Sequence, residues 1–366
     1  MSILCEGQII NKRYEVERFL GEGAFAEVYR VKHPFLGRQA MKVFKRAGIT
    51  LDEVREMLGE AMILSQIRHP NIVQVLDADV FESSSGICGF FTMEYIPGGS
   101  LEKFWRSFGD RFVPVETSVE LIKQICRGLS VAHKNNPPII HRDIKPQNIL
   151  VGYEAEGLRA RISDFGLAKK VNPLTLMATA AGTITYKPPE IFKDTKMDSP
   201  SGDVWAIGTT FYLLLTDKLP FSFSEDLGWG DRVSFEEAIT APSKINPDVD
   251  KALDKILMKA MKIEPKERFH SAKEMLEALD TWERKSCNPL RNTSLSSESL
   301  SKEALGKFTP MNRTDGEDLA KLAFDAKKNG LLAEAADLME EAFNKYPELR
   351  DKYAHQIKLW RCGISM

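Results

Sequence analysis

The segment "IIHRDIKPQNIL", residues 139–150, constrains the fold of this chain more than any other. It places Asp143, Lys145 and Asn148 in a polar loop between apolar residues, and Pro146 fixes part of the loop's backbone. A carboxylate, an ammonium and an amide so close together provide a base, a counter-charge for phosphate and a metal ligand. The segment therefore indicates an active-site loop, with an ordinary turn as the alternative.

A second polar segment, "ISDFGLA" at 162–168, follows shortly after the first. Asp164 comes after a short strand-like run and before a permissive glycine. Asp164 and Asn148 together offer the oxygen ligands that Mg²⁺ prefers. Two unrelated turns are not expected to supply these groups in this order, so we predict a single magnesium-dependent site.

A third segment, "FLGEGAFAEVYR" at 19–30, has two interpretations. Gly21 and Gly23 lie between strand-like runs and suit either a plain hairpin or a loop that covers nucleotide phosphates. The next run, "RQAMKVF", favours the phosphate loop, because Lys42 lies among apolar neighbours and needs a phosphate or carboxylate partner. A helix expected over 51–67 carries two candidate carboxylates on one face, Glu56 and Glu60.

Length and composition limit the possible classes of protein. With 366 residues, 43% of them hydrophobic, the chain can form two domains, or one large domain with an appendage. Its 50 basic and 52 acidic residues indicate neither a nucleic-acid partner nor a membrane-adhering surface. The N-terminus lacks an apolar run of signal-peptide length, and no run of about 18 apolar residues could span a membrane. We therefore expect a cytoplasmic protein.

The pattern along the chain predicts four successive parts. Short strands with one helix form a small lobe over about 14–94, and amphipathic helices such as 115–135 form a larger lobe over about 97–283. Residues 284–316 are rich in Ser, Asn and Thr, which suits a flexible linker or a solvated loop. Helical periodicity returns over 317–360.

With these segments in order, residues 14–283 resemble a eukaryotic-type serine/threonine protein kinase, similar to the bacterial members of that family. The resemblance implies an α+β fold with two lobes. It also implies ATP and Mg²⁺ as cofactors, with Mn²⁺ as an alternative ion, and Ser or Thr hydroxyls of proteins as substrates.

The resemblance assigns roles to the charged residues. Asp143 would accept the proton of the substrate hydroxyl, and Lys145 would neutralise charge on the transferring phosphoryl group. Lys42 would bind the α- and β-phosphates. Its partner would be Glu60, which stands ten residues before Pro70 of "HPN", as the family's helix glutamate does. Asn148 and Asp164 would coordinate Mg²⁺.

The resemblance also assigns the nucleotide contacts. Backbone amides near Gly21 and Gly23 would approach the phosphates, and Ala26 stands where the family has a third glycine. Met93 occupies the gatekeeper position. The residues that would contact adenine are Leu20, Val28, Ala40, Met93, Glu94 and Ile96. The Glu94 carbonyl and the Ile96 amide would form hydrogen bonds with the ring.

Two further positions concern the framework of the larger lobe. "GTITYKPPE" resembles the end of an activation segment, with Pro188 where alanine is usual. Glu190 in this segment is expected to form a buried ion pair with Arg268. Asp203 of "DVWAIG" matches the aspartate that holds the catalytic loop from behind.

The tail over 317–360 has the spacing of a tetratricopeptide repeat. Small and apolar residues fall on the repeat pattern at Leu319, Leu322, Ala323, Ala326, Gly330, Ala335, Met339, Ala342 and Pro347. A single repeat cannot bury its own face. The tail should therefore dock on the kinase domain or bind a partner protein, unless it is a helical hairpin that merely resembles the repeat.

Two other functions are possible from the sequence. A pseudokinase scaffold acting through the tail is disfavoured because Lys42, Glu60, Asp143, Asn148 and Asp164 are all present. A small-molecule phosphotransferase of the aminoglycoside kinase type is disfavoured by Lys145 and by the complete "GTITYKPPE" segment.

The resemblance predicts a phosphorylation site in the activation segment. Thr179, four residues before Thr183, stands at the matching position. A phosphate on Thr179 would pair with Arg142 and would add about two negative charges. Mass spectrometry of the active protein is expected to find phosphate on Thr179, with Thr175 as the second choice. If both threonines are unmodified in active protein, this prediction is wrong.

Overall fold

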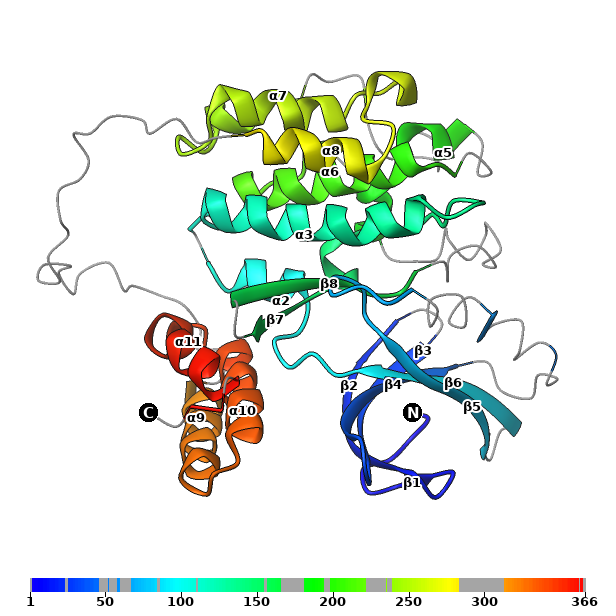
Figure 1. Cartoon of the computed structure of the whole chain (residues 1–366), viewed down its shortest axis with the longest axis vertical. Coiled ribbons are helices and arrows are strands. Elements are labelled where there is room, and N and C mark those ends of the chain that lie inside the picture. Colours follow the sequence, from blue (N-terminus) through cyan, green and yellow to red (C-terminus); the bar gives the residue numbers. More distant parts are fainter. Residues whose placement is uncertain are drawn as a thin grey trace, which may run out of the picture.

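The computed structural model describes residues 2–23, 26–45, 52, 58–59, 67–83, 86–109, 111–154, 157–165, 181–193, 198–221, 235, 239–282, 313–361 and 363–364. These residues form a β-sheet lobe, a helical lobe and a group of three C-terminal helices (Figure 1). The sheet and helical lobes agree with the α+β, two-lobed architecture predicted from the sequence.

The small lobe is one antiparallel sheet with strand order β1-β2-β3-β4-β6-β5. Its strands are β1 (Ile9–Ile10), β2 (Tyr14–Glu22), β3 (Ala26–His33), β4 (Gly37–Phe44), β5 (Val75–Ser83) and β6 (Gly86–Glu94). The strand-like runs expected on either side of Gly21 and Gly23 lie in β2 and β3, and the run "RQAMKVF" lies in β4. Most of the helix expected over 51–67, including Glu56 and Glu60, lies outside the described residues.

The sheet has two apolar faces because side chains alternate along each strand. In β4, Met41 and Val43 join one cluster, and Ala40 and Phe44 join the other. Lys42 lies between Met41 and Val43, so it shares the face of Ala40 and Phe44. That face also packs against Leu150 of the helical lobe, which directs Lys42 toward the junction of the two lobes.

The large lobe is built from helices around one core, with a short hairpin near the sheet lobe. Its helices are α2 (Leu101–Arg106), α3 (Val115–His133), α5 (Pro189–Lys193), α6 (Pro200–Thr216), α7 (Lys251–Ala260) and α8 (Ala272–Asp280). The hairpin pairs β7 (Ile149–Glu154) with β8 (Gly157–Ile162). Nearly every residue of α6 is buried, as expected for a helix that is apolar on all sides and central in its lobe.

The expected ion pair between Glu190 and Arg268 is confirmed. The two Arg268 Nη atoms lie 2.8 and 2.6 Å from the Glu190 carboxylate oxygens, and Arg268 is 1% exposed. The guanidinium also donates to the carbonyls of Lys262, Ile263 and Ser201 and lies over the ring of Trp205. The buried charge is therefore fully hydrogen-bonded, which is the condition under which such a pair is tolerated.

Three helices follow the part of the chain that was expected to be a linker: α9 (Arg313–Lys328), α10 (Leu332–Lys345) and α11 (Glu348–Arg361). α9 begins before residue 317, where the tail was expected to start. The helices share a core that includes Ala323, Met339 and Trp360, and Tyr153 of β7 packs against it. In Figure 1 they lie beside β7 and α2, near the junction of the two lobes.

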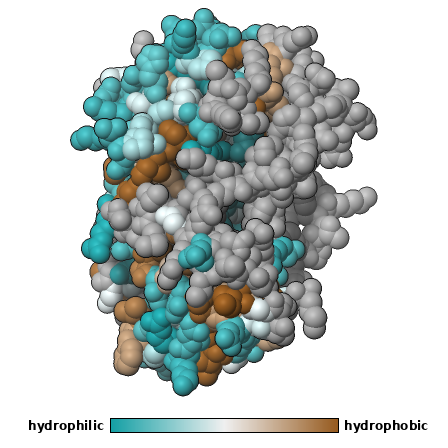
Figure 2. All heavy atoms as spheres, turned by 90° about the vertical axis from the view of Figure 1, so that its right-hand side faces the viewer, coloured by the Kyte–Doolittle hydropathy of each residue, from teal (hydrophilic) through white to brown (hydrophobic). Residues whose placement is uncertain are grey.

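Among the described residues, no helix is both long and apolar enough to span a lipid bilayer. Figure 2 shows one face of the molecule, where hydrophilic residues cover most of the described surface at the outer end of the helical lobe. Hydrophobic residues form smaller patches between them.

The Glu190→Gln variant is expected to lower the free energy of unfolding by about 3–5 kcal/mol, because it leaves the Arg268 guanidinium buried without its counter-charge. Urea unfolding followed by circular dichroism measures this loss. Glu277→Gln is the matched control, since its ion pair with Lys273 is exposed and should contribute less than about 1 kcal/mol. Equally small losses in the two variants would contradict the prediction.

Candidate active site

The β7–β8 hairpin brings the two polar loops to one place. Ile149 lies opposite Ile162, and the Ser163 N–H donates to the Asn148 carbonyl over 2.9 Å. Asp164 therefore follows β8 at the end of the hairpin where Asn148 precedes β7. Asp164 has a φ of 61°, an uncommon conformation for a residue with a side chain and one that is often found at functional sites.

Asp203 holds the loop that contains Asp143. Its carboxylate is buried and accepts hydrogen bonds from the backbone N–H groups of His141 and Arg142, over 2.8 and 2.9 Å. His133 Nε2 lies 2.9 Å from the same carboxylate. Burial raises the pKa of Asp203, but the hydrogen bond from His133 and the other interactions outweigh it and lower that pKa. The expectation that Asp203 supports the loop from behind is confirmed.

Asp143 lies in a cluster of donors. The Asn148 amide nitrogen and Lys145 Nζ lie 2.9 and 2.8 Å from Asp143 Oδ2. Lys187 Nζ lies 3.3 Å from Asp143 Oδ1 and donates to the carbonyl of Arg142 over 2.7 Å. Burial raises the pKa of Asp143, but the charges of Lys187 and Lys145 outweigh it and bring that pKa to about 2. The carboxylate is therefore ionised at neutral pH.

Lys42 connects the sheet lobe to the second polar loop. Its Nζ lies 2.5 Å from Asp164 Oδ1, and its side chain is only 11% exposed. The anionic partner that the sequence required for Lys42 is thus Asp164 in this structure. Glu60, the partner expected from the resemblance, lies outside the described residues.

The residues expected around adenine come together at the lobe junction. Leu20, Val28, Ala40 and Met93 belong to one apolar cluster, which also includes Leu150 of β7. Ile96 is buried, and Glu94 is half-buried with its carboxylate 3.3 Å from Arg161 Nε. Sequence reasoning did not select Leu150, although its place two residues after Asn148 in an apolar strand was an available signal.

The glycine-rich segment forms a hairpin between β2 and β3. Gly21 lies opposite Val28, and the Gly23 N–H donates to the Ala26 carbonyl over 2.8 Å. A Cβ atom added at Gly21 would meet no atom within 4 Å, and neither Gly21 nor Gly23 has a positive φ. The hairpin fold itself therefore does not require glycine at these two positions.

The donor set near Asp164 fits Mg²⁺. Because the Asn148 amide nitrogen donates to Asp143, the Asn148 amide oxygen is the atom that can face a cation, together with the Asp164 carboxylate. In the described part of the chain, no group of three or more His, Cys, Asp or Glu side chains could hold a metal ion. A site with only a few protein ligands is compatible with Mg²⁺, because this ion usually keeps several water ligands and also binds substrate phosphates.

Comparison with known proteins identifies the family. The family model described as "Protein kinase domain" matches residues 14–279. The chain belongs to the protein kinase family.

Individual relatives of this protein kinase are similar over most of its length. A probable serine/threonine-protein kinase of Clostridium perfringens is 32% identical over 278 residues, which are 75% of this chain and 39% of the relative. The tyrosine-protein kinase MasK of Myxococcus xanthus is 29% identical over 286 residues, or 74% of this chain and 43% of the relative. The chain spans about two fifths of these curated relatives.

Among solved structures, the kinase domain of Mycobacterium tuberculosis PknI matches with a TM-score of 0.57 and 26% identity. The match covers 76% of this chain and 98% of the PknI chain. Since the matched region includes both lobes, the likeness supports the kinase fold described above.

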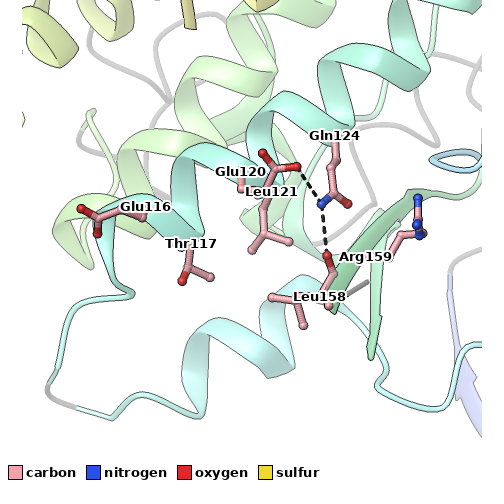
Figure 3. Close-up of a pocket in the computed structure, with 8 residues that line it drawn as sticks. Glu116, Thr117, Glu120, Leu121, Gln124, Leu158 and Arg159 are labelled. Atoms are coloured by element: carbon pink, nitrogen blue, oxygen red, sulfur yellow. Dashed lines mark hydrogen bonds between the residues drawn. The ribbon is translucent and has the colours of Figure 1, made fainter. Parts of the chain in front are cut away.

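The two candidate phosphorylation sites, Thr175 and Thr179, lie outside the described residues. Arg142, which was expected to pair with a phosphate on Thr179, instead has its Nε atom 2.6 Å from the Asp198 carboxylate. A pocket of about 480 Å³ lies between α3 and β8 (Figure 3). It is lined in part by Gln124, whose amide nitrogen donates to the Glu120 carboxylate and to the Leu158 carbonyl.

Lys187 is the charged neighbour of Asp143 that sequence reasoning missed. The signal available was a lysine within "GTITYKPPE", next to the noted Pro188. In Lys187→Met, we expect the pKa of Asp143 to rise from about 2, because burial raises it and the variant removes the larger of the two lysine charges that lower it. Titration of ¹³C-aspartate signals by NMR measures this pKa, and Asp143→Asn identifies the resonance.

The sign of the effect on stability follows from the same pKa. Because folding lowers the pKa of Asp143, its contribution to stability is present above about pH 3.8 and is lost as the pH falls toward 2. Lys187→Met should lose part of this contribution. Lys255→Met, at an exposed position on α7, is the control. An unchanged Asp143 titration in Lys187→Met would refute the role of Lys187.

Proposed function

We propose that this chain is a Mg-ATP-dependent protein serine/threonine kinase. The observation that carries the proposal is the 2.5 Å contact between Lys42 and Asp164, next to the loop that contains Asp143. It brings a phosphate-binding cation from one lobe to a magnesium ligand from the other. A scaffold without catalysis would not need these opposite charges at one buried junction.

The roles of the charged groups follow from their positions. Asp143 orients the substrate hydroxyl and accepts its proton, and Lys145 offsets charge on the transferring phosphoryl group. The pKa of Asp143 at about 2 suits orientation better than strong base catalysis. Because phosphoryl transfer has a loose transition state, positioning and electrostatic stabilisation contribute most of the rate enhancement.

The nucleotide is expected to lie between the lobes. Asn148 and Asp164 would hold Mg²⁺, which would neutralise negative charge on the phosphates, and Lys42 would bind the α- and β-phosphates. The fold does not require glycine at positions 21 and 23. The presence of Gly21 and Gly23 is therefore better explained by the room that glycine leaves for phosphate beside the backbone amides than by the geometry of the turn.

The adenine ring is expected in the apolar slot at the lobe junction. Leu20, Val28 and Ala40 would line it from the sheet lobe and Leu150 from the helical lobe. Met93 would be the gatekeeper, and the Glu94 carbonyl and Ile96 amide would hydrogen-bond the ring. Ala26, which is buried in the same cluster, adds only a methyl group relative to glycine, so it is compatible with nucleotide binding.

We also infer a division of the chain into a kinase domain over 14–283, a linker over 284–316 and a tetratricopeptide-like tail over 317–360. Contacts of Glu341 with Arg18 and Tyr95 support docking of the tail on the kinase domain rather than on a separate partner. The small residues on the repeat pattern include Ala323 and Ala335, which are fully buried between the tail helices. The cytoplasmic location expected from the sequence stays a prediction.

Incubation of the purified chain with labelled ATP, Mg²⁺ and a generic protein substrate tests the proposed function. Wild type should label protein, and phosphoamino-acid analysis should find phosphoserine or phosphothreonine. Asp143→Ala should lose at least about a hundredfold in rate, because it removes the group that orients the hydroxyl. Asp248→Ala, at an exposed position far from this loop in the sequence, is the control.

Three outcomes of this assay would count against the proposal. Absence of labelling by wild type would overturn it, and equal labelling by Asp143→Ala would implicate a contaminant. Phosphotyrosine alone would instead favour the activity named for the Myxococcus xanthus relative.

A further inference from the structure

The segment between the two lobes carries a side chain that connects the nucleotide site with the C-terminal helices. Tyr95 lies between Glu94 and Ile96, whose backbone groups are proposed to bind adenine. The Tyr95 hydroxyl donates a hydrogen bond to Glu341 Oε1 of α10 over 3.0 Å. A residue of the tail thus holds the segment that is expected to hold the ring.

Glu341 is well placed to fix Tyr95 rigidly. The residue is 6% exposed, and Arg18 Nη2 of β2 lies 2.9 Å from the same Oε1 atom. Arg30 of β3 also pairs with this oxygen, and its guanidinium lies 5.7 Å from the centre of the Tyr95 ring. Hydrogen bonds to a buried carboxylate are stronger than those between neutral groups, and low exposure limits screening by solvent.

The ionisation of Tyr95 is consistent with this contact. Burial raises the pKa of the Tyr95 phenol, and the charge of Glu341 raises it further. The phenol therefore keeps its proton at neutral pH and acts as the donor.

The tail contacts the helical lobe as well. The Phe343 ring packs against that of Tyr153 in β7, with 5.9 Å between centres, and the Tyr153 N–H donates to Glu340 over 3.3 Å. Arg350 of α11 lies over the ring of Phe104 in α2, 4.6 Å from its centre. Figure 1 shows the three helices beside this part of the helical lobe. The tail therefore contacts both lobes and the segment that joins them.

We propose that Glu341 is a positioning residue for the nucleotide site, which holds residues 94–96 through Tyr95 and so raises the affinity of the kinase domain for ATP. This inference rests on the proposed role of Glu94 and Ile96 in binding adenine. Holding a binding segment in its bound conformation before the ligand arrives reduces the ordering cost of binding. The tail thereby strengthens ATP binding without touching the nucleotide.

Tyr95→Phe and Glu341→Gln test the proposal in the full chain. Tyr95→Phe removes only the hydroxyl, and Glu341→Gln removes the charge with little change of shape. Each should raise the Kd for a non-hydrolysable ATP analogue with Mg²⁺ by about three- to tenfold, measured by calorimetry. KM for ATP should rise in parallel, and kcat should change less than about twofold, because the loss is in nucleotide binding and not in the chemical step.

The double variant and a control separate positioning from general destabilisation. Tyr95→Phe combined with Glu341→Gln should raise Kd no more than the larger single effect, because both variants act through the same contact between Tyr95 and Glu341. Glu334→Gln is the matched control on α10, since the Glu334 side chain is 44% exposed and its carboxylate lies 3.8 Å from Arg38. Its Kd for the ATP analogue should equal that of wild type.

The possible results distinguish this inference from the proposed function. If wild type binds the analogue and both single variants bind it equally well, the positioning role is overturned and the kinase activity stands. An equal rise of Kd in Glu334→Gln, or additive effects in the double variant, would also overturn it. If wild type does not bind the analogue, the proposed function fails, and this inference fails with it.

Discussion

The arrangement of the candidate active site depends on one buried carboxylate, Asp203. Its two oxygens accept the backbone N–H groups of His141 and Arg142, so the backbone that leads into Asp143 is fixed from behind. A carboxylate this deeply buried is stable only because these groups and His133 satisfy it. Arg142 has a φ of 70°, and the bonds to Asp203 hold the loop in this otherwise unfavourable conformation.

Once the loop is fixed, electrostatics determines how the remaining groups are arranged. Asp143 is surrounded by Lys145, Lys187 and the Asn148 amide, and Asp164 is paired with Lys42. Each of these half-buried carboxylates thus has a cation beside it, which offsets the cost of desolvation. Such a site is suited to a polyanionic ligand, because phosphates can interact with cations that already converge there.

The C-terminal helices bury one part of their surface among themselves and another part against the kinase domain. A tail of three helices buries part of its apolar surface within itself, as Met339 and Trp360 show, and leaves a charged and aromatic face for the kinase domain. Glu341 then meets two arginines of the sheet lobe, while Phe343 and Arg350 meet aromatic rings of the helical lobe. The tail therefore contacts the kinase domain on both sides of the lobe junction.

Local sequence patterns by themselves determined strands β2, β3 and β4 of the small lobe, most of the helix expected over 115–135 and the polar loops around Asp143 and Asp164. Alternation, amphipathicity and loop chemistry are encoded over a few residues. The partnership of Glu190 with Arg268 was also predictable, but only through resemblance to a family. Tertiary structure alone decided that Lys187 lies beside Asp143, that Leu150 joins the apolar slot and that Glu341 bonds to Tyr95. Glu341 and Tyr95 are 246 residues apart, and no local pattern specifies which distant surfaces a folded chain brings together.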